Sequence, residues 1–335
     1  MAIKTIEIQD SKGEIYYPHT DASVVKYGDS DVATELNEKA NPNLLINGDF
    51  RINQRDKSTY SASGQYSVDR WKLNTDGKAG CLIVHDGYIE LKGSETGQLY
   101  LEYILEEKDT INCLGKKVTV SCMVKGINLK KGNFFIQYGD YNVSTIDKKI
   151  FQYTEINKSD YVKLQFTCDI PSNISKLIIT IGSYDNYDGG LINIDGSICI
   201  KYVKLELGSK ATPFTSRPYG EELALCKRYY FKNRWLSLRI SNMGSNIITT
   251  TSFNYPVTMR ITPTVRAIIE QPINQIRTFD FSTNILNPTT EQIKHRQSGI
   301  INEEMIDFQF DSNLEVKDYN LEIKDYAYEF DSEMY

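Results

Sequence analysis

The chain has 335 residues, of which 40% are apolar, enough to bury a hydrophobic core across two or three modules. Its 44 acidic and 38 basic residues give a net charge of -6 without a basic stripe, which argues against a nucleic-acid binder. No apolar run approaches the roughly 18 residues of a membrane-spanning helix, so we expect no membrane insertion. The first residues do not resemble a secretory signal, and we expect the protein to be made in a cytoplasm.

Residues 1–43 predict a small β-hairpin followed by a brief helix. The hairpin would turn at residues 10–13, and the helix would be capped by Ser30 and Asp31 and end before Asn41 and Pro42. The expected helix carries a narrow apolar stripe of about three turns, formed by Val32, Leu36 and Ala40. Because so short a helix is unstable alone, we expect this segment to associate with copies of itself.

Residues 44–216 read as one antiparallel β-sandwich. The segments Asn43–Phe50 and Tyr202–Gly208 predict its first and last strands, which would pair with each other. Gly, Asn and Asp separate the other apolar segments every ten to twenty residues, which favours a sandwich over alternating strands and helices. The expected strands are Ala79–His85, Tyr88–Leu91, Gln98–Ile104, Lys117–Val124, Phe134–Tyr138, Val162–Cys168, Lys176–Ile181 and Ile198–Leu207.

Residues 217–232 predict a connector helix, and residues 233–335 predict a second, smaller β-sandwich. Acidic residues at the front of the helix and basic residues at its back suit the helix dipole. The expected strands of the distal sandwich are Trp235–Ile240, Ile247–Tyr255, Val265–Ile269 and Tyr326–Phe330. The predicted class is therefore mainly β, with one connector helix between two sandwiches.

Six cysteines occur, at positions 81, 113, 122, 168, 199 and 226. Cys122 and Cys168 continue the apolar alternation of two expected strands, as small core residues do. We expect six free thiols, because a chain without an export signal folds in a reducing compartment. No C-x-x-C spacing is present, and we expect no metal and no other cofactor.

No nucleotide-binding or hydrolase motif is present, and the three histidines fall in three different segments. A glycan hydrolase would need two carboxyl groups on either side of the bond. The adjacent pairs Glu221-Glu222 and Glu303-Glu304 instead favour a charged helix start and a solvated loop. We therefore predict a protein that is not an enzyme.

Glycan contact requires an aromatic ring near amide, carboxylate or guanidinium groups. Two stretches meet this requirement: a loop rich in Asp, Asn and Gly, and the start of the distal sandwich. The candidate binding residues are Tyr184, Tyr187, Arg234, Trp235 and Arg239. Trp71, on an alternating strand, is expected in the core instead.

The opening Asn-Leu-Leu-Ile-Asn-Gly-Asp-Phe resembles the start of jelly-roll carbohydrate-binding modules. Together with Val68–Trp71, Val203–Phe214, Gly220–Tyr230 and Pro256–Thr264, it resembles tail-fibre or receptor-binding proteins of bacteriophages and prophages of Gram-positive hosts. Some carbohydrate-binding modules hold a structural calcium, but Arg51, Lys201 and Lys204 stand here where acidic residues would be needed.

The resemblance implies a virion-tail protein, assembled in the bacterial host and released on lysis, that attaches the particle to the cell surface. Its implied partners are two further copies in a homotrimer, other tail or baseplate proteins at residues 1–43, and a bacterial surface glycan or surface-layer glycoprotein. Residues 233–335 would form the receptor-binding tip. The resemblance leaves two alternatives open: a polysaccharide-degrading tail enzyme, and a structural spacer without a ligand.

Overall fold

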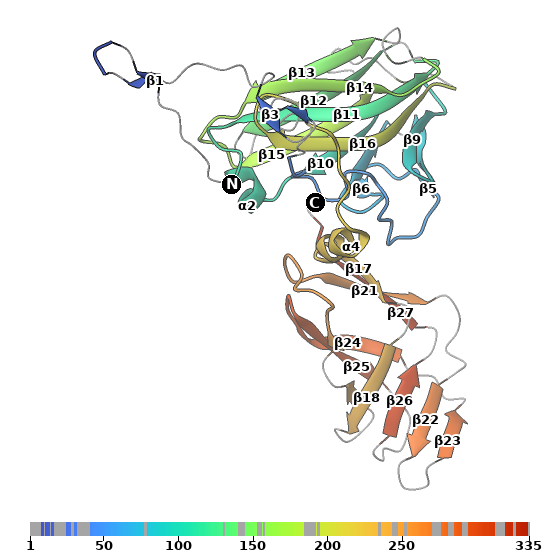
Figure 1. Ribbon diagram of the computed structural model, residues 1–335. Coiled ribbons are helices and arrows are strands. Elements are labelled where there is room, and N and C mark those ends of the chain that lie inside the picture. Colours follow the sequence, from blue (N-terminus) through green and yellow to red (C-terminus); the bar gives the residue numbers. More distant parts are fainter. Residues whose placement is uncertain are drawn as a thin grey trace.

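The computed structural model shows a mainly β protein, which confirms the predicted class (Figure 1). It describes residues 8–9, 11–13, 15–16, 25–27, 30–31, 41–76, 79–129, 131–139, 145–152, 156, 158–183, 192, 195–233, 236–242, 247–250, 253–269, 276–280, 285–289, 294–311, 319–323 and 326–333.

Two antiparallel six-stranded sheets form a jelly-roll-like sandwich. In spatial order, the first sheet contains β13 (Thr145–Gln152), β12 (Lys131–Gly139), β15 (Lys176–Ser183), β10 (Leu99–Ile104), β7 (Lys72–Thr75) and β6 (Gln65–Tyr66). The second sheet contains β14 (Val162–Asp169), β11 (Lys117–Ile127), β16 (Ser197–Leu207), β9 (Tyr88–Gly93), β8 (Gly80–His85) and β5 (Thr59–Tyr60). A short helix, α2 (Glu107–Ile111), follows β10.

The core lies between these sheets and follows the alternation seen in the sequence. On β11, for example, Val118, Val120, Cys122 and Val124 are fully buried. Trp71 is also fully buried, as predicted, and its ring packs against Phe50 and Tyr103 with centroid distances of 5.0 and 5.2 Å. Burial of this apolar surface is the main force that holds the two sheets together.

The segment Asn43–Phe50 lies along β16 as expected, but it is a series of turns and not a strand. The amide side chain of Asn43 donates to Val203 O at 3.0 Å and accepts from Leu205 N at 3.0 Å. Asn47 and Phe50 have φ angles of 55° and 60°, which an extended strand does not allow. The prediction of a paired first strand was therefore wrong in conformation although right in position.

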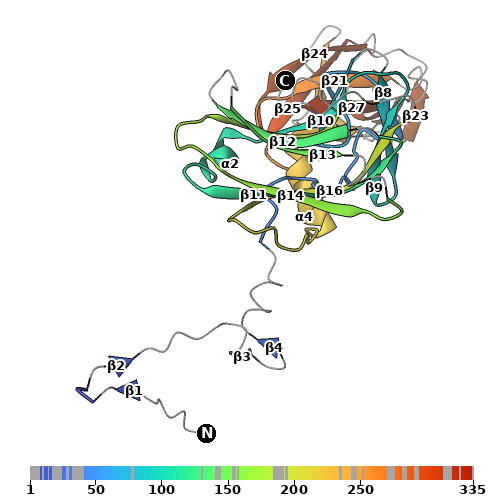
Figure 2. The same cartoon turned by 90° about the horizontal axis from the view of Figure 1, so that it is seen from above.

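Two short hairpins occupy the described part of the N-terminal segment. Strand β1 (Ile8–Gln9) pairs with β2 (Ile15–Tyr16), and β3 (Lys26–Tyr27) pairs with β4 (Ser30–Asp31). Figure 2 shows both hairpins apart from the sheets of the sandwich. The first hairpin agrees with the prediction. The predicted helix cap at Ser30 and Asp31 is wrong because these residues pair in a strand, and the rest of that predicted helix lies outside the described residues.

After the sandwich, helix α4 (Tyr219–Lys227) leads into the distal strands. A three-stranded sheet has the order β17 (Tyr230–Asn233), β27 (Tyr326–Asp331) and β21 (Thr264–Ile269). The larger sheet contains β20 (Phe253–Asn254), β25 (Met305–Asp311), β19 (Ile247–Thr250), β18 (Leu236–Asn242), β26 (Tyr319–Ile323), β22 (Ile276–Asp280) and β23 (Ile285–Thr289), with β24 (Lys294–Ile301) paired to β25.

Candidate functional site

The sequence-predicted binding residues cannot be placed in the described structure. Tyr184, Tyr187, Arg234 and Trp235 lie outside the described residues. Arg239 belongs to β18, but its side chain also lies outside them. These five residues therefore stay a prediction.

Three of the sequence phrases that carry the resemblance, the opening segment, Val68–Trp71 and Gly220–Tyr230, are joined by hydrogen bonds. The buried amide of Asn47 donates to Ile52 O at 2.8 Å and to Asp69 O at 2.9 Å. The indole of Trp71 donates to Asn47 O at 2.9 Å, and the backbone N–H of Asn47 donates to the carboxylate of Glu222 on α4. These phrases are therefore structural, because they hold the opening segment, the turn at Trp71 and the connector helix together.

The acidic residues of the two adjacent pairs, Glu221-Glu222 and Glu303-Glu304, make separate structural contacts. Glu222 is buried and forms an ion pair of 3.1 Å with Arg217, whereas its neighbour Glu221 is exposed. Glu303 accepts a hydrogen bond of 3.2 Å from the hydroxyl of Thr262 in a surface loop. These contacts agree with the structural interpretation of both pairs.

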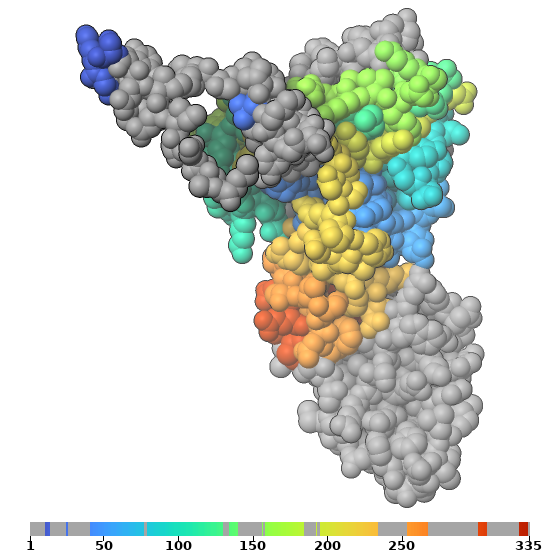
Figure 3. Space-filling view, in the orientation of Figure 1, coloured from blue at the N-terminus to red at the C-terminus, as the bar shows by residue number. Residues whose placement is uncertain are grey.

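A cleft lies between one edge of the sandwich and the first distal strands, and we call it the junction cleft. Its volume is about 520 Å³, within the usual range for small-ligand sites. Figure 3 shows the distal strands, in orange and red, directly beyond helix α4 and next to the sandwich. The cleft is lined by Arg55, Lys57, Thr59, Tyr60, Ser61, Ala62, Gln65 and Tyr66 of the sandwich and by Tyr230, Thr264, Arg266, Glu329 and Asp331 of the distal strands.

On the distal wall of the cleft, hydrogen bonds join Tyr230, Arg266 and Glu329. Glu329 accepts from the hydroxyl of Tyr230 at 2.7 Å and from Nε of Arg266 at 3.0 Å. Burial alone would raise the pKa of Glu329, but the hydrogen bonds from Arg266 and Tyr230 lower it. The carboxylate is therefore held in its charged form, while 74% of the Arg266 side chain stays exposed at the cleft.

The sandwich wall contributes a buried guanidinium and two tyrosines. Arg55 lies over the ring of Tyr230, 3.9 Å from its centroid, and over Tyr66 at 5.9 Å. Its side chain is 11% exposed, and neither terminal nitrogen makes a hydrogen bond. Burial raises the pKa of Tyr60 to about 12, so its hydroxyl keeps its proton and donates to Asn53.

A second polar surface lies on the outward face of the first sheet, where side chains alternate with core residues. Asn74 of β7 donates to Glu102 of β10 at 2.8 Å. Burial raises the pKa of Glu102, and the nearby Lys72 and Lys176 act in the opposite direction. Tyr100 is two residues away on the same strand and half-buried. We call this surface the sheet face and treat it as the competing location for a ligand.

Among the described residues, no group of three or more His, Cys, Asp or Glu side chains is arranged to hold a metal ion. All six cysteines are free thiols, with Cys81 half-buried and the others buried. No helix in the described part of the chain has the length and apolar character to cross a membrane.

No protein-family model matches the chain, and the comparison with curated proteins finds no match. Similar solved structures include the module TmCBM61 in complex with β-1,4-galactotriose, with 13% identity and a TM-score of 0.34 over 50% of this chain and 99% of that one. The CBM22-1 xylan-binding domain of Paenibacillus barcinonensis Xyn10C has 16% identity and a TM-score of 0.29, over 52% and 99% of the two chains.

A third similar structure is the enzymatically active domain of tailspike protein 4 of bacteriophage CBA120. It has 14% identity and a TM-score of 0.31, over 50% of this chain but only 21% of that one. These likenesses concern the fold of about half of the chain, a jelly-roll-like sandwich, and carry no argument about its ligand.

The junction cleft was not predicted from the sequence. Its residues come from four stretches, near positions 60, 230, 265 and 330, and no local pattern joins them. The one available signal was the tyrosine content, 23 residues, because tyrosine is frequent both in strands and at recognition surfaces.

Proposed function

We propose that the protein attaches a phage tail, or a phage-tail-like particle, to a glycan or glycoprotein of a Gram-positive cell surface, without cutting it. The observation that carries the binding proposal is the junction cleft, in which tyrosines lie beside guanidinium, carboxylate and hydroxyl groups. The tail assignment is supported by the sequence phrases that resemble tail-fibre and receptor-binding proteins.

The cleft offers polar groups for the hydroxyls of a sugar, and it is also lined by three tyrosines, each at most 8% exposed. The apolar faces of a sugar stack on aromatic rings, while its hydroxyls both donate and accept hydrogen bonds. Arg266, with 74% of its side chain exposed, offers N–H donors, and Thr59, Ser61 and Gln65 add small polar groups on the sandwich wall. A sugar in the cleft would therefore contact both walls at once.

The rival function, a polysaccharide-degrading enzyme, has weaker support at this site. A glycosidase needs one carboxyl group whose raised pKa lets it act as the general acid. The cleft holds two carboxylates, Glu329 and Asp331, and Arg266 and Tyr230 keep Glu329 charged by lowering its pKa. We therefore propose binding without hydrolysis.

The proposal is tested by incubating the purified protein with cell-wall polysaccharide from Gram-positive bacteria. We expect the polysaccharide to retain the protein without releasing reducing ends. Released reducing ends would establish the enzyme instead, and neither retention nor release would establish the structural spacer. Denatured protein at the same concentration is the control for nonspecific adsorption.

A further inference from the structure

The sandwich and the C-terminal end of the described chain are joined by a buried charge cluster, which we call the clasp. Arg70 donates to the carboxylate of Glu333 at 2.6 Å, and the two side chains are 1% and 0% exposed. Arg70 also donates to Ile104 O at 2.8 Å and stacks on Tyr229, 3.6 Å from its ring centroid. The pair therefore ties the turn at Trp71 to the last described residues.

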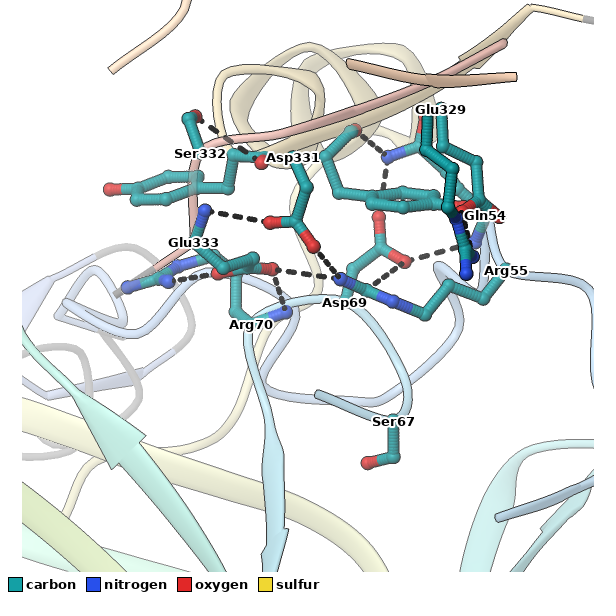
Figure 4. Close-up of polar contacts among 12 residues, drawn as sticks. Gln54, Arg55, Ser67, Asp69, Arg70, Glu329, Asp331, Ser332 and Glu333 are labelled. Carbon is teal, nitrogen blue, oxygen red and sulfur yellow. Dashed lines mark hydrogen bonds and ion pairs between the residues drawn. The ribbon is translucent and has the colours of Figure 1, made fainter. Parts of the chain in front are cut away.

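Arg55 and three carboxylates extend the clasp to the edge of the junction cleft (Figure 4). The guanidinium of Arg55 lies 3.9 Å from Asp69, 3.8 Å from Asp331 and 3.9 Å from Glu333. Asp69 is fully buried and accepts from the backbone N–H and side-chain amide of Gln54 at 2.9 and 2.5 Å. Arg55 and Asp331 also line the cleft, so the clasp and the cleft share two residues.

The charges of the clasp do not balance when all its carboxylates are ionised. Two guanidinium groups, Arg55 and Arg70, face three carboxylates, Asp69, Asp331 and Glu333. Asp69 and Glu333 have side chains that are 0% exposed, and that of Asp331 is 22% exposed. Holding three negative charges in so enclosed a cluster is costly, and binding one proton removes the excess. Of the two fully enclosed carboxylates, Glu333 pairs with Arg70 at 2.6 Å whereas Asp69 lies 3.9 Å from Arg55, so the charge of Asp69 is the less well compensated (Figure 4).

Every element packed around Asp69 contributes a charged or titratable group. The residues after the opening segment contribute Arg55, strand β5 contributes Tyr60, helix α4 contributes Cys226, β17 contributes Tyr230, and the C-terminal residues contribute Glu333. Burial raises the pKa of Asp69 to about 6, although Arg55 and the hydrogen bonds from Gln54 act in the opposite direction.

We propose that the clasp is an acid-tightened latch that positions the two walls of the junction cleft. With Asp69 protonated, two arginines pair with two carboxylates and the distal strands stay docked. With Asp69 ionised, the buried excess charge favours separation of the walls. The clasp residues are thus positioning residues, and their effect on the ligand rests on the proposed glycan-binding function.

The direction of the pH effect follows from proton linkage. A carboxyl group whose pKa is higher in the docked state than in solvent stabilises the docked state when protonated. This stabilisation is present below the solvent pKa of about 4 and is lost as the pH rises through about 6. The clasp should therefore be tighter at pH 5.5 than at pH 7.5.

The latch is tested by amide hydrogen exchange of the full chain at pH 5.5 and pH 7.5, corrected for intrinsic rates. We expect the opening equilibrium constant of residues 228–233 and 326–333 to rise roughly fourfold at the higher pH, because it grows tenfold per pH unit only between the solvent pKa of about 4 and the docked pKa of about 6 and then levels off. Asp69→Asn should abolish this dependence. Asp169→Asn, which removes the exposed ion pair with Lys117 on β11, should retain it.

A second variant keeps the test decisive if Asp69→Asn does not fold. Glu333→Gln also leaves two ionised carboxylates for two arginines, and it should reduce the pH dependence strongly. Exchange in wild-type protein that does not depend on pH, or full dependence in both variants, would overturn the latch. Loss of polysaccharide retention at every pH would contradict the proposed function but not the latch, because the exchange measurement needs no ligand.

Discussion

Asn47 shows how one buried side chain can join distant parts of this chain. It is fully buried, its φ angle is 55°, and its amide bonds to the backbone of Ile52 and Asp69. Asparagine tolerates this left-handed conformation better than most residues because its short side chain bonds locally. Asn47 therefore adopts a turn conformation and fixes it with three hydrogen bonds of its side chain.

Replacing Asn47 with alanine should destabilise the protein by about 3 kcal/mol. The change removes the hydrogen bonds of the Asn47 side chain to the buried backbone of Ile52 and Asp69 and puts a less tolerant residue at positive φ. Urea unfolding followed by tryptophan fluorescence measures the effect, and Asn173→Ala at an exposed position is the control. A loss below about 0.5 kcal/mol, the scale of an ordinary surface substitution, would contradict the role given to Asn47.

The burial of single residues could be predicted where apolar and polar residues alternate along a strand. Trp71 and Cys122 were placed in the core from the pattern of their neighbours, and both are fully buried. Arg70, next to Trp71, was not predicted to be buried, because a charged residue needs a buried partner. That partner, Glu333, lies 263 residues further along the chain, and no sequence pattern connects the two.

Strands were the most predictable elements. The expected strands Lys117–Val124, Val162–Cys168 and Lys176–Ile181 appear as β11, β14 and β15, each with additional residues. The opening segment was misread because its apolar residues suggested pairing, whereas its backbone turns to fit against β16. At Gly48 the backbone passes so close to Val203 of β16 that a side chain has no room.

This close approach makes Gly48 a test of the opening segment. A Cβ at this position would lie 2.5 Å from Val203 O and 2.3 Å from the amide of Asn43. Gly48→Ala should therefore cost about 1 to 3 kcal/mol through overpacking. Gly220→Ala, at the start of α4 with open space around it, should be neutral or slightly stabilising. Equal thermal stability of both variants would show that the segment does not lie against β16.

At the scale of the whole molecule, we predict a homotrimer. The two N-terminal hairpins are two-residue pairings that cannot bury much apolar surface themselves. Three copies on one axis would point three binding sites at the same surface and raise avidity by about 10² to 10⁴. Light scattering should give three times 38.4 kDa, and removal of residues 1–42 should weaken the association. A monomer at micromolar concentration would contradict this prediction.

The strands of the sandwich and the connector helix could be anticipated from the sequence, but the contact between the sandwich and the distal strands could not. Turn residues and alternating strands mark the sandwich, and the charge pattern marks the connector helix. The junction cleft and the clasp depend on how the distal strands dock, which is a long-range contact between residues that carry no local signal. This contact is also where we place the proposed ligand.

The central claim is that the junction cleft binds a bacterial surface glycan, and its most direct test is a comparison of binding isotherms. Wild-type protein, Arg266→Ala in the cleft and Tyr100→Ala on the sheet face would each be titrated with the same solubilised cell-wall polysaccharide. We predict that wild-type protein binds, that Arg266→Ala weakens binding at least tenfold, and that Tyr100→Ala changes it less than twofold. Loss of binding in Tyr100→Ala with an unchanged Arg266→Ala would contradict the claim and place the ligand on the sheet face.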